Sequence, residues 1–245
     1  MASFPTANTA AELLARVRQR RPRVHCLMNT VVQKFTADGI TAVGGIPSMT
    51  SSEEEIESFV SKVDALTINL GTLDAARRKV IRMAVEVANA EGKPWIVDPV
   101  HCDYSPSRLE FARELVTLHP TIVRGNAAEM AVIGDVGRAL RIQTGPQDLF
   151  SDGARKAKVL NGHAWMAKVT GTGCLSGGVI AAFMAVEPDQ LLAATAALTV
   201  TGVSAEIAAK HARGPGTFEA AFLDALNAID ANDILSLARI EHDED

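Results

Sequence analysis

A glycine-rich stretch, "KVTGTGC" at residues 168–174, runs directly into an apolar segment that is typical of a buried helix. Its glycines let the backbone approach a ligand and adopt positive φ, and the first turn of the following helix has unpaired N–H groups. Because these groups and the helix dipole favour negative charge, the stretch predicts a phosphate site. The same field is expected to lower the pKa of Cys174, a candidate base or nucleophile. The stretch alone leaves open a structural role, in which Cys174 fills an apolar hole.

Further polar residues lie at the ends of predicted strands. Asp98 closes the apolar run "PWIVD" at the carboxyl edge of the sheet, where open α/β folds bind ligands, and it could help to hold a metal–phosphate complex. Arg124 can balance phosphate charge, and Asn126 and Glu129 lie one helical turn apart. Thr144, before a glycine, is a weaker sign of a nucleotide site. The structural alternatives are that Asp98 caps the next segment and that "RGNAAE" at 124–129 is a capped surface helix.

Short β-rich runs alternate with amphipathic helical stretches in the first half of the chain, which is the pattern of a parallel sheet built from βαβ units. The expected strands are 23–28, 65–70, 94–98, 121–124 and 139–143, and the expected helices are 10–20, 30–43, 53–62, 73–91 and 106–118. Capping-box spacings begin two of these helices, at Thr9–Glu12 and at Ser52–Glu55. Later features are a hairpin over 148–161 turning at Asp152-Gly153, helices from 172 onward with a break at 214–216 and a restart at Thr217, and a solvated tail at 241–245.

The composition indicates one α/β domain over residues 1–245 and excludes several classes of protein. Hydrophobic residues make up 47% of the 245 residues, and the net charge of −5 without a long basic stripe argues against nucleic-acid binding. Three separated cysteines and the absence of a signal peptide predict a cytoplasmic location. The apolar stretches 169–186 and 190–205 approach the length of membrane spans, but they are interpreted as central helices packed on the sheet. No Walker loop or dinucleotide-binding spacing occurs.

The order of the polar parts resembles the ribokinase-like fold of small-molecule kinases. Within that fold, nearly the whole chain is similar to the hydroxyethylthiazole kinase family. The similarity lies in "SMTSSEEEIE" at 48–57, "LTINLGTLD" at 66–74, "GKPWIVDPV" at 92–100, "IVRGNAAE" at 122–129, "NGHAWMAKVTGTGCLSG" at 161–177 and "GPGTFEAAFLDAL" at 214–226. Cys174 is the most specific residue, because most ribokinase-like enzymes have an aspartate base there. The resemblance implies a three-layer α/β fold with a mostly parallel central sheet flanked by helices.

The resemblance also implies an activity, the ATP-dependent phosphorylation of 4-methyl-5-(2-hydroxyethyl)thiazole in thiamine salvage. Cys174 would accept or orient the hydroxyl proton of this alcohol. The other implied contacts are Asn29, Met49 and Gly171 for the thiazole alcohol, Arg124, Thr144 and Gly173 for ATP, and Asp98 and Glu129 for Mg²⁺. Because the family forms trimers with active sites between subunits, a homotrimer is expected.

Three features depart from the family pattern. Residues 101–104, His-Cys-Asp-Tyr, replace a small Gly-Ala-Gly turn, and a shortened segment at about 130–143 lacks a helix and a loop that the family usually has. Cys26 and Met28 stand where the family more often has Asn and Thr. These changes motivate two alternatives: a kinase of the same fold for another small alcohol, and a non-catalytic thiazole-binding relative that has lost ATP handling.

Possible metal ligands occur together within the changed segment, at His101, Cys102 and Asp103. Adjacent residues of an extended segment point in different directions and rarely bind one ion. The sequence therefore does not predict a metal site from these three residues.

Overall fold

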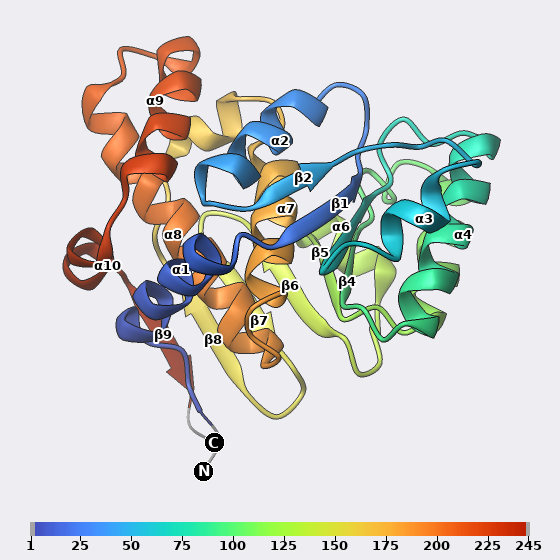
Figure 1. The fold of residues 1–245 in the computed structure, drawn as a ribbon. Coiled ribbons are helices and arrows are strands. Elements are labelled where there is room, and N and C mark those ends of the chain that lie inside the picture. The colour runs from blue at the N-terminus through green and yellow to red at the C-terminus, as the bar shows by residue number, and fades with distance from the viewer. Residues whose placement is uncertain (1–2, 244–245) are drawn as a thin grey trace.

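The computed structural model describes residues 3–243, which form a nine-stranded sheet covered by helices on both faces (Figure 1). The strands lie in the order β2-β1-β3-β4-β5-β6-β7-β8-β9. All pairings from β2 to β6 are parallel, and those from β6 to β9 are antiparallel. The bounds are β1 Arg23–Leu27, β2 Ile46–Ser48, β3 Ala65–Asn69, β4 Trp95–Asp98, β5 Ile122–Asn126, β6 Leu140–Thr144, β7 Asp148–Ser151, β8 Lys156–Val159 and β9 Ile240–Asp243.

The helices divide between the two faces of the sheet, so the expected three-layer α/β class is confirmed. Helices α3 to α6 pack on one face, while α1, α2, α7 and α8 cover the other and α9 and α10 pack against α8. Their bounds are α1 Ala7–Arg20, α2 Gln33–Ala42, α3 Ile56–Val60, α4 Ala75–Ala90, α5 Pro106–Thr117, α6 Ala127–Ile133, α7 Thr172–Met184, α8 Gln190–His211, α9 Pro215–Ala228 and α10 Ala231–Leu237. A 3-10 helix, Ala164–Lys168, precedes α7.

Two helices begin earlier than the sequence predicts. Helix α1 begins at Ala7, because the side chain of Thr6, rather than Thr9, caps it by accepting the Thr9 N–H at 3.1 Å. Helix α9 begins at Pro215, whose fixed φ suits the first turn of a helix. Thr217, the expected start, instead lies inside this first turn and accepts the main-chain N–H of Arg213 at 2.8 Å.

The helix expected over 53–62 is reduced to the five residues of α3. The predicted capping box does not form, because the carboxylate of Glu55 accepts the hydroxyl of Thr50 at 2.7 Å instead of the Ser52 N–H. Residues 53–55 form a turn before the helix begins.

The sequence missed two strands at the edges of the sheet. Strand β2 has only three residues, including a proline, and pairs with β1. Strand β9 pairs with β8 and takes up residues 241–243 of the segment that was expected to be a tail. The last two residues of that expected tail, 244–245, lie outside the described residues.

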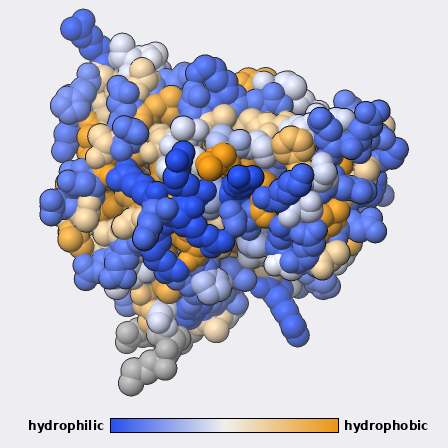
Figure 2. Space-filling view, viewed as in Figure 1, coloured by the Kyte–Doolittle hydropathy of each residue, from blue (hydrophilic) through white to orange (hydrophobic). Residues whose placement is uncertain are grey.

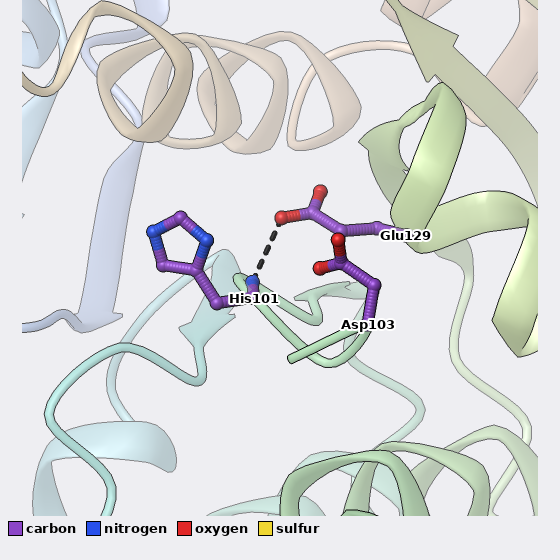
Figure 3. Close-up of side chains that lie close together, drawn as sticks. All are labelled: His101, Asp103 and Glu129. Carbon is purple, nitrogen blue, oxygen red and sulfur yellow. Dashed lines mark hydrogen bonds between the residues drawn. The ribbon is translucent and has the colours of Figure 1, made fainter. Parts of the chain in front are cut away.

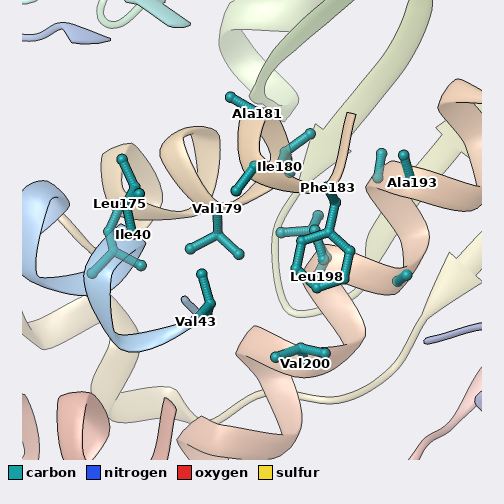
Figure 4. Packing of buried hydrophobic residues seen from close by; sticks show 14 of the residues in the cluster. Ile40, Val43, Leu175, Val179, Ile180, Ala181, Phe183, Ala193, Leu198 and Val200 are labelled. Carbon is teal, nitrogen blue, oxygen red and sulfur yellow. The ribbon is translucent and has the colours of Figure 1, made fainter. Parts of the chain in front are cut away.

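Helices α7 and α8 account for the two long apolar stretches. Within residues 3–243, α8 is the one helix long and apolar enough to cross a membrane, but 83% of its apolar window is buried inside the molecule. Helix α7 has 13 residues and packs against α2 and α8, with Ile40, Leu175 and Val179 close together (Figure 4). These are core helices, and the surface seen in Figure 2 is hydrophilic over most of its area.

Candidate active site

Polar side chains of three neighbouring strands meet on the face of the sheet that α7 covers. Successive side chains of a strand point to opposite faces, so Asp98 shares a face with Ile96 and Arg124 shares one with Ile122. Both isoleucines belong to the core beneath α7. The register of β3 and β4 pairs Asn69 with Asp98. The strand ends therefore bring Asn69, Asp98 and Arg124 to one edge of the sheet.

The glycines before α7 have two separate structural roles at this edge. Gly171 caps α7 with φ of 98°, and a Cβ there would lie 2.7 Å from Val32 Cγ1. At Gly173, a Cβ would lie 3.2 Å from Arg124 Nη2, so the missing side chain makes room for the guanidinium group. Gly171 thus lets the N-terminus of α7 pack closely against the start of α2, and Gly173 lets it approach Arg124 at a strand end.

Cys174 lies in the first turn of α7, and its thiol contacts polar groups. Asn69 Nδ2 donates to Cys174 Sγ at 3.2 Å, and Asn29 Nδ2 lies 3.8 Å from the same sulfur. Asn29 also donates to Asn69 Oδ1 at 3.0 Å, which fixes the two amides relative to each other. The structural alternative, in which Cys174 fills an apolar hole, does not fit these contacts.

Asp98 connects the cysteine to the positive charge of the site. Its Oδ2 accepts from Asn69 Nδ2 at 3.0 Å and from Arg124 Nη1 at 3.1 Å, and both members of this ion pair are almost fully buried. Arg124 Nη2 in turn donates to Thr144 Oγ1 at 3.4 Å. One hydrogen-bonded network therefore runs from Cys174 through Asn69 and Asp98 to Arg124 and Thr144.

The expected lowering of the cysteine pKa is wrong. Burial raises the pKa of the Cys174 thiol to about 11, and the negative charge of Asp98 adds to this effect, while Arg124 and the two amides oppose it. Burial also raises the pKa of Asp98 to about 6, against the attraction of Arg124. Desolvation is the largest cause in both cases, so at neutral pH the thiol is protonated and Asp98 is largely ionised.

A cavity of about 690 Å³ opens beside this network. Arg124, Thr144 and Gly173, the three residues expected to contact ATP, all line it. The remaining walls come from the turn between β6 and β7, the segment around the 3-10 helix, the first turns of α7 and the middle of α8. Its volume is within the usual range for small-molecule and cofactor sites.

Two residues of the cavity region were not singled out from the sequence. Asp148 lines the cavity and accepts the Gly145 N–H at 3.2 Å, and burial raises its pKa to about 6. Trp165 lies between the lining residues Ala164 and Met166, and its ring meets that of Phe218 edge-on, with centroids 5.9 Å apart.

Met49 lies directly after the edge strand β2 and is held in place from both sides by His25. His25 is fully buried, and burial lowers its pKa to about 4, so its ring is neutral. Its Nδ1 lies 2.8 Å from Ser48 Oγ, and its Nε2 lies 3.0 Å from the carbonyl oxygen of Thr50. The Nε2–H therefore donates to Thr50 while Nδ1 accepts from Ser48, and the two residues flanking Met49 are fastened to β1.

The changed segment 101–104 forms a turn beside Glu129 (Figure 3). His101 has a φ of 56°, a left-handed conformation that favours the glycine of the family pattern, and its N–H donates to Glu129 Oε1 at 2.8 Å. Cys102 is buried, whereas His101 and Asp103 are exposed beside Glu129. Because the segment turns, His101 and Asp103 come close to each other and to Glu129, whereas Cys102 is not part of this group.

Glu129 is also part of the capped helix that the sequence suggested. Its Oε2 accepts the N–H of Asn126 at 2.8 Å, and its own N–H donates to Asn126 Oδ1 at 3.0 Å, which forms a capping box for α6. Glu129 is nevertheless buried, so this helix end belongs to the site rather than to a free surface.

The sequence missed Asn69, although a signal for it was present. Asn69 ends the apolar strand "ALTIN" in the same way that Asp98 ends its own strand. His25 had no comparable signal, because a histidine inside an apolar strand does not reveal which loop it will hold.

Comparison with known proteins places the chain in one family. Residues 14–141 and 135–232 match the model of the hydroxyethylthiazole kinase family. A probable hydroxyethylthiazole kinase of Agrobacterium fabrum is 73% identical, with 98% of each chain covered, and a hydroxyethylthiazole kinase of Granulibacter bethesdensis is 40% identical, covering 93% of this chain and 92% of the relative. The two segments matched by the family model overlap at 135–141, within the segment expected to be shortened.

Solved structures agree with this placement. The hydroxyethylthiazole kinase protein of Pyrococcus horikoshii OT3 superposes with a TM-score of 0.94 at 35% identity, covering 97% of this chain and all of the other. The pyridoxal kinase of Staphylococcus aureus in complex with AMP-PCP, at 17% identity and a TM-score of 0.59, covers 72% of this chain and 85% of that one and shares the fold alone.

Fold and site together define the class, a small-molecule kinase of the ribokinase-like kind. The family model and the relatives extend over nearly the whole chain, and the chain belongs to the hydroxyethylthiazole kinase family. Neither alternative, the kinase for another alcohol or the non-catalytic relative, gains support from these comparisons.

Proposed function

We propose that this chain transfers the γ-phosphoryl group of ATP to the hydroxyl group of 4-methyl-5-(2-hydroxyethyl)thiazole. The placement of Cys174 carries the proposal: its sulfur lies 3.2 Å from Asn69 Nδ2 at the N-terminus of α7, and the neighbouring Gly173 lines the 690 Å³ cavity. Phosphoryl transfer depends mainly on positioning and charge stabilisation, and helix N–H groups can stabilise the oxygens of the transferred group.

Arg124, Thr144 and Gly173 are assigned to ATP. Arg124 has a buried Nε without a hydrogen-bond partner among the described residues, although its two terminal nitrogens are engaged. This Nε is closed off from the cavity, so a phosphate oxygen there would be bound by the terminal nitrogens of the same guanidinium group. The N–H of Gly173, in the first turn of α7, is available to the same phosphates.

Asn29, Met49 and Gly171 are assigned to the thiazole alcohol. Asn29 Nδ2 lies 3.8 Å from the Cys174 sulfur, and Gly171 precedes Cys174 by three residues. Met49 follows an edge strand, so a second copy of the chain against β2 would complete the pocket around it. This position supports the expected homotrimer with shared active sites, which remains a prediction together with the cytoplasmic location.

The raised pKa of Cys174 restricts what the thiol does at neutral pH. A neutral thiol can orient the hydroxyl group, but it must lose its own proton before it can accept another. In a loose transition state for phosphoryl transfer, the hydroxyl group of the alcohol can keep its proton until late in the reaction. If the thiolate is the base, kcat/KM should rise with pH towards about 11, whereas an orienting thiol would give a flat profile.

Mg²⁺ is assigned to Asp98 and Glu129, whose carboxylates suit this hard cation. Glu129 fits the assignment, because Asp103 places a second carboxylate oxygen within 4.8 Å of its own. Asp98 already accepts hydrogen bonds from Arg124 and Asn69. Its proposed roles are to orient Arg124 towards the phosphates of ATP and to contribute a carboxylate to the Mg²⁺ site. Bound Mg²⁺ would neutralise charge on the phosphates of ATP.

The test is alcohol-dependent release of ADP by the purified chain with MgATP. Cys174→Ala should lower kcat by about 10²-fold or more, and Cys174→Asp should retain activity with a pH profile shifted to lower pH. Cys26→Ala, a buried cysteine in β1, is the matched control for loss of a thiol. If wild-type protein binds the alcohol by calorimetry but releases no ADP at high enzyme concentration, the proposal is wrong.

A further inference from the structure

An excess of negative charge surrounds the turn after β4. Asp98, Asp103 and Glu129 face this region, and Asp98 has Arg124 as its ion-pair partner. Within residues 3–243, neither Asp103 nor Glu129 forms an ion pair. Glu129 is only 5% exposed, and a glutamate this deeply buried is normally compensated by a cation.

The geometry supplies a set of ligands for such a cation. One ligand atom from each of His101, Asp103 and Glu129 lies within 4.8 Å of the others (Figure 3). Ligand atoms about 2 Å from a central ion are at most roughly 4 Å apart, so only a small movement of the two exposed side chains is needed. The buried, hydrogen-bonded Glu129 is the fixed member, since backbone N–H groups of His101 and Asn126 hold its two oxygens.

We propose that His101, Asp103 and Glu129 bind a divalent transition-metal ion. One imidazole and two carboxylates suit Mn²⁺, Co²⁺ or Zn²⁺, whereas Mg²⁺ prefers oxygen ligands only. The site deepens the proposed function, because it shares Glu129 with the expected Mg²⁺ position. Its binding in the absence of nucleotide does not depend on that function.

The site adjoins the nucleotide cavity through the cap of α6. Glu129 is bonded in both directions to Asn126, which lines the cavity. An ion bound to Glu129 would therefore be linked through Asn126 to the cavity that Arg124 and Gly173 line. His101 and Asp103 belong to the segment that replaces the small Gly-Ala-Gly turn of the family pattern. The affinity of this chain for Mn²⁺ is therefore expected to be higher than that of a chain with the small turn.

The experiment is a titration of the metal-free full chain with MnCl₂, without nucleotide, in which electron paramagnetic resonance reports free Mn²⁺. His101→Gly removes the imidazole and relieves the left-handed backbone, so it should weaken Mn²⁺ binding at least tenfold without loss of fold. Asp103→Asn should weaken it by a similar factor. His119→Gly is the matched control, because His119 is also an exposed, left-handed histidine, with φ of 60°, but lies at the other end of α5.

The outcomes separate this inference from the proposed function. One bound Mn²⁺ that is lost in the His101 and Asp103 variants and kept in the His119 variant supports the site, whether or not ADP is released. Equal Mn²⁺ affinity in wild type and His101→Gly, or no binding to wild type at millimolar Mn²⁺, overturns it even if the chain is an active kinase. Thermal unfolding of each variant checks that a loss of binding does not reflect unfolding.

Discussion

The proposed nucleotide side and the proposed alcohol side of the site are built differently. On the nucleotide side, strands β5 and β6, the turn between β6 and β7, and α8 line a cavity of about 690 Å³ within one chain. On the alcohol side, Met49 follows β2, the edge strand of the sheet, next to the exposed side chains of Ile46 and Phe59. The proposed ATP site therefore lies within one chain, whereas the proposed alcohol pocket is expected to need a second copy.

The two sides also use different means to hold their functional groups. On the nucleotide side, a buried ion pair with Asp98 holds Arg124 in position. On the alcohol side, the neutral buried ring of His25 holds the residues on either side of Met49. Asn69 lies between them and bonds to Asp98, Cys174 and Asn29. Substitutions on either side should accordingly separate binding of ATP from binding of the alcohol.

The largest effect is expected on the nucleotide side, from Arg124→Leu. This change leaves Asp98 buried without its partner and should lower the free energy of unfolding by about 3–5 kcal/mol. Calorimetry should show ATP affinity reduced at least tenfold with alcohol affinity retained. The double variant Arg124→Leu/Asp98→Asn should recover stability but not ATP affinity. Equal loss of both affinities would contradict the separation of the two sides.

The next largest effect concerns His25 and depends on pH. An unfolded histidine titrates near 6.5 and His25 titrates near 4, so the neutral ring stabilises the fold above pH 6.5, and this stabilisation is lost as the pH falls towards 4. The loss is on the order of 3 kcal/mol. Urea unfolding of wild type and His25→Gln should therefore give a stability difference that shrinks between pH 7 and pH 4.

The comparison with His25→Gln is needed because Asp98 and Asp148 act in the opposite direction. Their raised pKa values, about 6, favour the folded state as they become protonated over the same range. His25→Gln should also raise KM for the alcohol while ATP affinity stays unchanged. His119→Gln, at an exposed position, serves as the control, and a pH-independent stability difference for His25→Gln would refute the assignment.

A smaller effect on stability, about 2 kcal/mol, is expected from Asn69→Leu, since it removes a donor to Asp98 and to the thiol. Because Asn69 connects the two sides, kcat should fall by tenfold or more while both KM values change little. Thr67→Val, on the same face of β3, is the control. Unchanged kcat in Asn69→Leu would show that the network is structural only.

The smallest effect on the isolated chain is expected from Ile46→Lys at the edge of the sheet. The side chain is 38% exposed, so the stability of the single chain should change by no more than about 0.5 kcal/mol. Sedimentation should show dissociation of the oligomer, and KM for the alcohol should rise while ATP affinity is kept. Leu235→Lys, an exposed position on α10, should do neither. If both variants behave alike, the alcohol pocket does not lie between copies.

The sequence predicted the parallel half of the fold well because apolar strands and capped helices alternate there. It failed where the tertiary structure decided the outcome. Strand β2 is too short to show a pattern, and β9 is strand only because β8 offers an edge to pair with. At the start of α3, the hydroxyl group of Thr50 donates to the carboxylate of Glu55, so this carboxylate is not available for the expected capping box.

The candidate site was predictable at strand ends and less predictable elsewhere. Asp98 and Arg124 converge because parallel strands share a carboxyl edge, a rule that also applies to Asn69. The pKa of Cys174 could not be obtained from its helix position, because its burial and the charge of Asp98 depend on distant residues. The turn at His101 was hidden because a left-handed histidine gives no sequence signal.

The position of Trp165 makes the cavity optically observable. The chain has two tryptophans: Trp165 adjoins the cavity-lining residues of the 3-10 helix, whereas Trp95 is fully buried in β4. An indole next to an occupied cavity changes its emission, while an indole in the core keeps its own. Trp95→Phe would leave Trp165 as the one tryptophan, beside the cavity, and excitation at a wavelength that Tyr104 does not absorb would let ligand entry be timed without any added dye.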